Sequence, residues 1–262
     1  MIRIVQAELQ RLLRRRTIVA TAAAAVTFAT VATIAVFAAA RESGPAASRG
    51  GTTIADLATA GGGTQAFAVG SSFVGFFVFV TFIALLASEF SGGTFRALLL
   101  RDPHRLRLIT GKLVGALVVA AGALALTEVV SFVLSVAMAP SKDIDTGVWF
   151  SLSGLGHAVA DYGTVLAGVT GWAIFAATLA VVFRSVPLAL GVGFAWAGPF
   201  ENIIVDSWTT GYRVFPGQVL AAIIQGGTPE VSLARAALTG VVYVGIAAVA
   251  AMTLLARRDV TS

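Results

Sequence analysis

Residues 17–40, TIVATAAAAVTFATVATIAVFAAA, form an unbroken run of 24 residues without a charged side chain. An α-helix rises about 1.5 Å per residue, so crossing a hydrocarbon core about 30 Å thick takes about 20 apolar residues. The run therefore predicts a membrane-spanning helix. It is also longer than the apolar core of about 7 to 15 residues in a secretory signal peptide, so we do not expect it to be cleaved.

The rest of the chain repeats this pattern. The sequence is 57% hydrophobic and 12% charged, with a mean hydropathy of +0.90, whereas soluble domains carry about 25% charged residues. We predict an all-α integral membrane protein with a single transmembrane domain over residues 1–262. Its six transmembrane helices are expected at about 17–40, 66–88, 113–138, 162–183, 187–205 and 236–256.

The positive charges predict the direction of these spans. The net charge is +5, and the basic residues form short clusters between apolar runs rather than one polar face, which argues against a nucleic-acid partner. Placing both termini in the cytoplasm puts 13 of the 18 Lys and Arg residues on that side, as the positive-inside rule requires. The excess of Arg over Lys and the frequent Ala favour a bacterial protein, hence the inner (cytoplasmic) membrane.

The leader, residues 1–16, has the spacing of an amphipathic helix. Val5, Leu9, Leu12 and Leu13 fall on one face, and most of the charged residues fall elsewhere. We expect a cytoplasmic helix lying in the interface with membrane lipid before the first span. The alternative is that the positive charges of the leader only fix the orientation of the first span and that the leader binds no partner.

A basic island, ASEFSGGTFRALLLRDPHRLRLITGK at 87–112, separates the second and third spans. Gly92 and Gly93 predict the end of the second span, residues 94–101 predict a short helix, and Asp102-Pro103 is typical of a cap that starts the next helix. Three consecutive Leu residues at 98–100 would be unfavourable in water, so we expect a docking surface. A helix resting on lipid headgroups is the alternative.

Another short helix is predicted between the fifth and sixth spans, in the segment 199–232. Pro216 is suited to a first helical turn, and Gly226 and Gly227 to an end after Ile224. We interpret this segment as an external re-entrant or interfacial helix. An ordinary loop with aromatic anchors is the alternative.

Sequence motifs for catalysis are missing. The chain has no Cys, no HExxH or GxSxG motif, and no GxxxxGK[ST] phosphate loop, since Gly111-Lys112 lacks the rest of that pattern. The two His residues, His104 and His157, fall in different predicted compartments, so we expect no metal site. We predict a non-enzymatic chain that does not hydrolyse ATP by itself.

Two features inside the spans are candidates for a translocation path. Glu128 is an acid in the third span, where burial of a carboxylate is costly unless it is paired or hydrated. It is either functional or held by a structural hydrogen bond to Thr127, Ser131 or another helix. Phe73, Phe76 and Phe77 line the path or, alternatively, face lipid or pack between helices. Gly111 and Gly115 have the small-xxx-small spacing of close helix contacts.

The island resembles the loop between spans two and three in type-2 permeases of ATP-binding-cassette transporters. The matching residues are Glu89, Gly93-Thr94, Arg96, Leu98 to Leu100, Pro103, Arg105 and Gly111-Lys112. The six-span layout, the leader, the segment before span six and the terminal ARRDV extend the resemblance to essentially the whole chain, while His104 departs from it.

This resemblance implies a permease subunit of an exporter, paired with a second copy or a related chain. ATP and Mg²⁺ would be bound by a separate ATPase subunit, so no cofactor is expected in this chain. The residues expected to couple to the ATPase are Glu89, Gly93, Thr94, Phe95, Arg96, Leu98, Leu99, Arg101, Arg105 and Lys112. Arg11, Arg14 and Arg15 of the leader are expected to transmit the motion, and one of them is expected to pair with Glu89.

Two other functions fit the sequence. One is an ion- or proton-coupled secondary transporter in which Glu128 is the coupling site. The other is a membrane scaffold or sensor without transport, whose 94–101 helix binds a regulatory protein.

Overall fold

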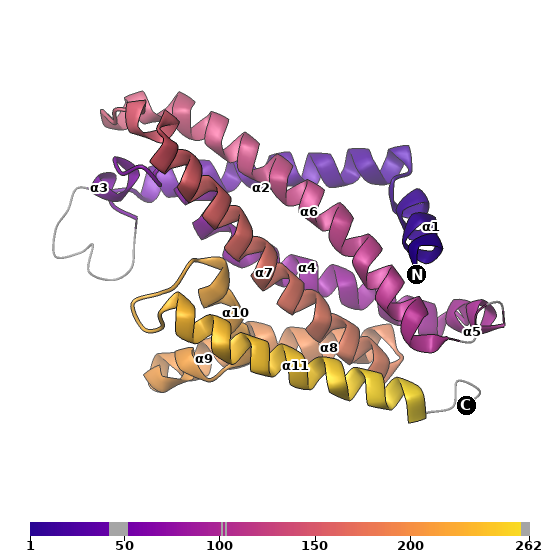
Figure 1. Cartoon of the computed structure of the whole chain (residues 1–262). Helices are drawn as coiled ribbons and strands as arrows, with labels where there is room; N and C mark the ends of the chain where they lie inside the picture. The colour runs from indigo at the N-terminus through magenta and orange to yellow at the C-terminus, as the bar shows by residue number, and fades with distance from the viewer. Residues whose placement is uncertain (42–51, 101, 103, 258–262) are drawn as a thin grey trace.

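The fold is a bundle of six long apolar segments, seen in a computed structural model that describes residues 1–41, 52–100, 102 and 104–257 (Figure 1). They are α2 (Arg15–Ala39), α4 (Gln65–Ser91), α6 (Arg105–Met138), α7 (Leu152–Phe183), the segment Val186–Val205 and α11 (Leu233–Arg257). Each is long and apolar enough to cross a bilayer. The predicted all-α class and the six spans are confirmed, and within the described residues extended backbone pairs only at isolated bridges.

Helix α7 lies at the centre of the bundle. It runs diagonally across the molecule in Figure 1 and contacts α4, α11, α10, α6 and α8. Its buried face is built from small and β-branched side chains, including Val165, Val169, Ala173, Ala176 and Ala180. Small side chains bring helix backbones close together, which maximises van der Waals contact where water cannot drive association.

Two spans begin earlier than the hydropathy pattern predicts. Helix α6 begins at Arg105 rather than near residue 113, and α7 begins at Leu152 rather than near residue 162. Hydropathy marks only the apolar part of a helix. The backbone hydrogen bonds of the helix continue past the first charged side chain into the polar region, so the helix is longer than the predicted span. As a consequence Asp161, which directly precedes the predicted span 162–183, lies within α7.

The fifth span is interrupted. Helix α8 (Val186–Ala195) passes into a single π-helical turn, η4 (Trp196–Phe200), and then into α9 (Glu201–Ser207). Pro199 lies inside the π turn. Proline has no N–H to donate and its ring clashes with the preceding turn, which favours a local widening of the helix.

The short helix before span six is confirmed. Helix α10 runs from Pro216 to Ile224, and the chain leaves it through Gly226 and Gly227 at φ values of 71° and 114°, a region that glycine adopts readily. It packs against α7, α11 and α4, and its side chains from Val219 to Ile224 are mostly buried. The alternative of an ordinary anchored loop is therefore wrong.

The remaining elements at this end of the bundle are α3 (Ile54–Leu57), η2 (Ala139–Lys142), η3 (Gly147–Phe150) and η5 (Thr209–Arg213). The buried Trp149 donates its indole N–H to the carbonyl of Leu57 at 3.0 Å, which ties η3 to α3. Residues 42–51, between the first two predicted spans, lie outside the described residues.

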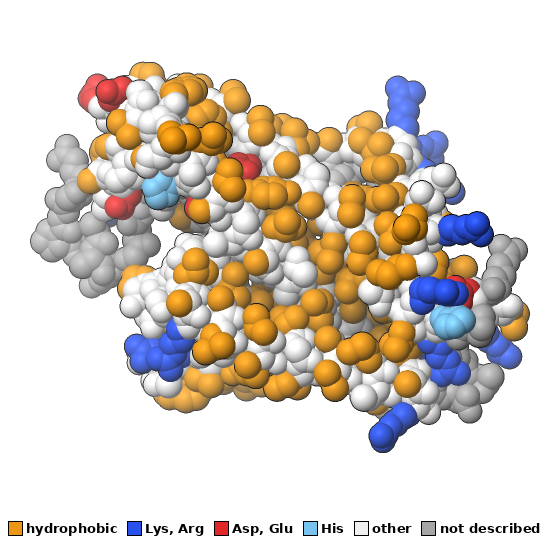
Figure 2. Space-filling view, viewed as in Figure 1, with side chains coloured by type: hydrophobic (Ala, Val, Ile, Leu, Met, Phe, Trp, Pro, Cys, Tyr) orange, Lys and Arg blue, Asp and Glu red, His pale blue; other side chains and the backbone are white. Residues whose placement is uncertain are grey.

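Basic side chains gather mostly at one end of the molecule. Figure 2 shows apolar side chains over most of the middle, with Lys and Arg concentrated at the end where Figure 1 places α1, α5 and the last turn of α11. An even number of spans brings the start and the end of the described bundle to the same side. Charged side chains at the ends and apolar ones between them are the pattern of a bilayer-spanning protein.

Candidate functional site

The leader helix α1 (Ile2–Leu12) packs against the start of α6. A Cβ added at Gly111 would lie 2.7 Å from the side chain of Ile4, and one added at Gly115 would lie 3.0 Å from that of Glu8. The two glycines therefore make the close helix contact that their spacing predicts. The leader is shorter than predicted, because its helix ends at Leu12 and a new helix, α2, begins at Arg15.

Four charged side chains from three helices meet at this contact, and we name them the basal charge cluster: Glu8, Arg11, Glu89 and Lys112. The Lys112 Nζ donates to Glu89 Oε1 at 2.6 Å and to Glu8 Oε2 at 3.2 Å. The Arg11 Nη1 donates to the same Glu89 oxygen at 2.7 Å and lies 3.6 Å from Glu8 Oε1. The cluster joins α1 to the end of α4 and the start of α6.

The cluster is electrically balanced and mostly out of contact with solvent. Glu8, Glu89 and Lys112 are each buried, whereas the Arg11 side chain is 44% exposed at the edge. The hydrogen bond to Glu89 raises the pKa of Arg11 above its ordinary value. Two acids facing two bases leave no net buried charge, which is the condition under which a buried ionic group is tolerated.

The predicted pairing of Glu89 with a leader Arg is confirmed for Arg11. Arg14 and Arg15 flank the break between α1 and α2 and are exposed, and the described contacts place neither of them on Glu89. Sequence reasoning missed Glu8, which was assigned to the polar face but is the buried member of α1. One feature of the sequence could have indicated a buried acid here. Lys112 follows Gly111, so a cation lies next to the position where two helices come close together.

Helix α5 (Thr94–Leu99) lies at the same end, between α4 and α6. Gly93 turns the chain into it at φ 70°, a left-handed conformation that costs glycine little. Phe95 is buried in a small apolar cluster with Leu108, Val181 and Leu255.

The exposed surface of α5 is narrower than predicted. Leu98 and Leu99 pack against the apolar cluster around Phe95, so they serve packing within the chain. Thr94, Arg96, Ala97 and the following Leu100 are exposed, and Leu100 has 87% of its surface accessible. Arg101 and Pro103, which belong to the predicted site and motif, lie outside the described residues.

The start of α6 differs from the prediction. Its first residue is Arg105 and His104 precedes it, so Asp102 is not the helix cap. Instead the Asp102 carboxylate accepts hydrogen bonds from Arg107 at 2.6 Å and from the backbone N–H of His104 at 3.1 Å. The bonds from Arg107 hold the pKa of Asp102 well below its usual range. The Arg105 side chain contacts a different helix: its Nη1 donates to the carbonyl of Leu255 in α11 at 3.1 Å.

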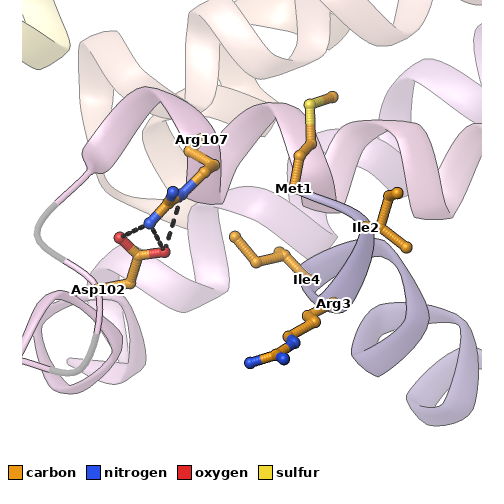
Figure 3. A pocket seen from close by; sticks show the side chains of 6 residues that line it. All are labelled: Met1, Ile2, Arg3, Ile4, Asp102 and Arg107. Carbon is orange, nitrogen blue, oxygen red and sulfur yellow. Dashed lines mark hydrogen bonds and ion pairs between the residues drawn. The ribbon is translucent and has the colours of Figure 1, made fainter.

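A surface groove separates the tip of α1 from the start of α6 (Figure 3). It has a volume of about 530 Å³ and is lined by Met1, Ile2, Arg3 and Ile4 on one side and by Asp102 and Arg107 on the other. Met1 and Ile2 are more than half exposed. The groove therefore offers apolar surface beside α5, bordered by Arg3 and by the ion pair of Asp102 with Arg107.

The predicted path residues lie elsewhere in the bundle. Phe73 and Phe77 are 69% and 61% exposed on the outer face of α4, and Phe76 packs edge to face against Phe194 of α8. Glu128 and Asp161 lie close enough for their charges to interact. The Oε1 atom of Glu128 is buried and has no hydrogen-bond partner within the described residues. Whether Glu128 is functional or structural therefore stays a prediction.

Among the described residues, no group of three His, Asp or Glu side chains is placed to hold a metal ion. The six apolar helices and the charge-rich ends define the class: an all-α, multi-pass membrane protein. The chain belongs to the family described as "Protein of unknown function (DUF2705)", whose model matches residues 46–261. The match includes Glu89 and Lys112 and begins after Glu8 and Arg11. Comparison with curated proteins gave no match.

Proposed function

We propose that this chain is the permease subunit of an ATP-driven exporter of the ATP-binding-cassette type. It would pair with a second copy or a related chain and would receive the motion of a separate ATPase, which binds ATP and Mg²⁺. The chain itself would carry no catalytic site. In the proposed orientation, the end of the bundle with α1 and α5 faces the cytoplasm of a bacterium, because cytoplasmic segments hold the excess of Lys and Arg.

The basal charge cluster is the observation that carries this proposal. A helix on the surface transmits force to a transmembrane span only where it is rigidly connected to it. Here Lys112 and Arg11 join the leader to the ends of spans two and three, and α5 lies between those same two spans. A push on α5 or α1 would therefore move both spans together.

The exposed part of this end suits a protein partner. Arg96 and Leu100 of the α5 region are exposed, and the groove beside them has apolar walls with Arg3 at its edge. Apolar surface ringed by charge is typical of protein contact sites. An ATPase surface with an apolar side chain near acidic residues would complement it.

The direct test is purification of the chain from its native membrane in mild detergent, followed by mass spectrometry of the proteins that accompany it. We expect a nucleotide-binding subunit in the wild-type sample and its loss in Leu100→Asp and Arg96→Glu variants. Leu152→Asp is the matched control, since Leu152 is 86% exposed in α7 near the opposite end of the bundle. Absence of any ATPase from the wild-type complex would contradict the proposal, and recovery of a regulatory protein instead would favour a scaffold or sensor.

A gradient-driven secondary transporter is the second candidate, favoured by the buried and unpaired Oε1 atom of Glu128. An ionisable group inside a membrane bundle commonly marks an ion or proton pathway. Transport by the purified chain in vesicles, driven by a proton or sodium gradient without any ATPase and lost in Glu128→Gln, would establish this function in place of the first.

A further inference from the structure

The chain turns between α1 and α2, at Leu13 and Arg14. Figure 1 shows α1 running across the end of α2 instead of continuing along its axis. The backbone of Arg14 is extended, with φ −66° and ψ 143°, so one helix ends and another begins at this point. Because the first candidate span starts at Arg15, the turn lies where the chain enters the bilayer.

Both sides of the turn expose apolar side chains. Leu13 is 51% exposed before it, and Ile18 and Val19 are 46% and 60% exposed at the start of α2. Ile18 and Val19 belong to the candidate span, so acyl chains would cover them in a bilayer. An exposed Leu beside that boundary is stabilised by contact with the same acyl chains.

The exposed charge of the turn is entirely positive. Glu8 is the only acid among residues 1–41, and it is 4% exposed because it lies in the interior beside Lys112. The arginines at 14–16 are exposed, and no carboxylate of the described residues forms an ion pair with any of them. The fold therefore removes the one negative charge of the leader from its surface and leaves these cations unbalanced.

The arginines suit a phosphate group at the level of the lipid headgroups. A guanidinium group forms paired hydrogen bonds with phosphate oxygens. Figure 2 shows basic side chains projecting from the corner of the molecule where Figure 1 places the turn. An acidic protein in the cytoplasm would reach the arginines but not Ile18 and Val19 inside the span. A lipid offers an anion and apolar chains together, so it complements the whole surface.

We propose that the turn between α1 and α2 binds an anionic phospholipid. Its phosphate would lie among Arg14, Arg15 and Arg16, and its acyl chains along Leu13 and Ile18. Arg14 and Arg15, which the sequence predicted to transmit motion, would then anchor the leader to the membrane surface. The proposal goes beyond the coupling to an ATPase and is independent of it, because binding is measured on the isolated chain in lipid.

The test uses the full chain with Val19→Cys, labelled with the fluorophore bimane and reconstituted into phosphatidylcholine vesicles. Because the chain has no native Cys, the label marks only the start of α2. Increasing fractions of dibrominated phosphatidylglycerol or of dibrominated phosphatidylcholine are then included. Bromine quenches the fluorophore at short range, so the two quenching curves give the relative affinity of the anionic and the zwitterionic lipid for this surface.

We expect the wild-type surface to prefer phosphatidylglycerol by about fivefold or more, since one arginine near an anionic headgroup strengthens binding by about that factor. The triple variant Arg14→Gln, Arg15→Gln and Arg16→Gln should bind both lipids equally. The matched control should keep the wild-type preference. It removes the same number of positive charges from exposed positions at the opposite end of the bundle: Arg41→Gln, Arg213→Gln and Arg235→Gln.

A second pair of variants guards against misfolding of the triple variant. Gln10 is exposed one turn before Arg14, so a substitution there leaves the arginines and the packing of α1 in place. Gln10→Glu would offer Arg14 a competing carboxylate and should lower the preference for phosphatidylglycerol. Gln10→Lys adds a cation at the same position and should raise it.

Four outcomes would overturn the proposal. They are a wild-type preference below about twofold, a preference that survives the triple variant, an equal loss in the matched control, and a loss in the triple variant without any response to the two Gln10 variants. The second outcome, combined with loss of the ATPase from the purified triple variant, would mean that the arginines contact a protein instead of lipid.

Discussion

Removal of Lys112 should be far more damaging than removal of Arg11, although both are bonded to the same oxygen of Glu89. Lys112 lies 2.6 Å from Glu89 and 3.2 Å from Glu8, and its side chain is 7% exposed. At an effective dielectric constant of about 20, these two contacts correspond to gross attractions of about 6 and about 5 kcal/mol. Much of this gain is offset by the desolvation of the ammonium group.

The loss in the free energy of unfolding caused by Lys112→Met depends on the charges that remain in the cluster. Two buried carboxylates would then share the single, partly exposed Arg11, and an uncompensated buried charge costs about 3–5 kcal/mol. Arg11→Met also leaves two acids facing one base, but the Arg11 side chain is 44% exposed, so water takes its place beside Glu89 and the change should cost only about 1 kcal/mol. For a chain of this size the first change lowers the unfolding temperature by roughly 10 °C and the second by about 2–4 °C.

The assay is thermal unfolding of the purified chain in one detergent, followed by intrinsic fluorescence. The double variant Glu89→Gln with Lys112→Met restores charge balance, because Glu8 and Arg11 remain as a pair, and it should be more stable than Lys112→Met alone. Equal losses for Lys112→Met and Arg11→Met, or a double variant no better than Lys112→Met, would refute a cluster held by buried charge.

The attachment of the leader can be followed separately by cross-linking. The chain has no native Cys, and a Cβ at position 111 would lie 3.0 Å from that of Ile4. This is shorter than the separation of about 3.5–4.5 Å in a disulfide, so a small outward shift of α1 would bring the pair into range. The pair Ile4→Cys with Gly111→Cys should therefore cross-link under mild oxidation. Adding Lys112→Met should slow that cross-link, and an unchanged rate would mean that packing alone holds the leader.

Three further changes test the same end of the molecule by thermal unfolding. Gly115→Leu should displace α1 and lower stability, whereas Gly122→Leu in the same helix has open space and should be nearly neutral; similar losses would contradict the close packing of the leader. Phe95→Ala empties a buried site and should cost about 3–5 kcal/mol, against about 0.5 kcal/mol or less for the exposed Leu100→Ala; a reversed order would mean that α5 is docked differently. Gly93→Ala should cost about 1 kcal/mol because φ is 70° there, and a neutral result would contradict that turn.

The sequence by itself determined the class of this protein, the six spans and the helix that begins at Pro216. These follow from local rules: charge-free runs of about 20 residues, the position of proline and glycine, and the distribution of Arg. It also predicted that Glu89 needs a partner from the leader, because an acid at the end of a span is costly when left unpaired.

Only the tertiary structure decided which side chains meet. Glu8 belonged to the polar face by its spacing, yet Gly115 admits it to the interior beside Lys112. Leu98 and Leu99 would be costly in water, but the cluster around Phe95 covers them. Glu201 lies inside the apolar fifth span, and its carboxylate accepts hydrogen bonds from the N–H groups of Gly217 and Gln218 because α10 folds back against that span. Contacts between residues far apart in the chain depend on how whole helices pack, and no local pattern encodes that.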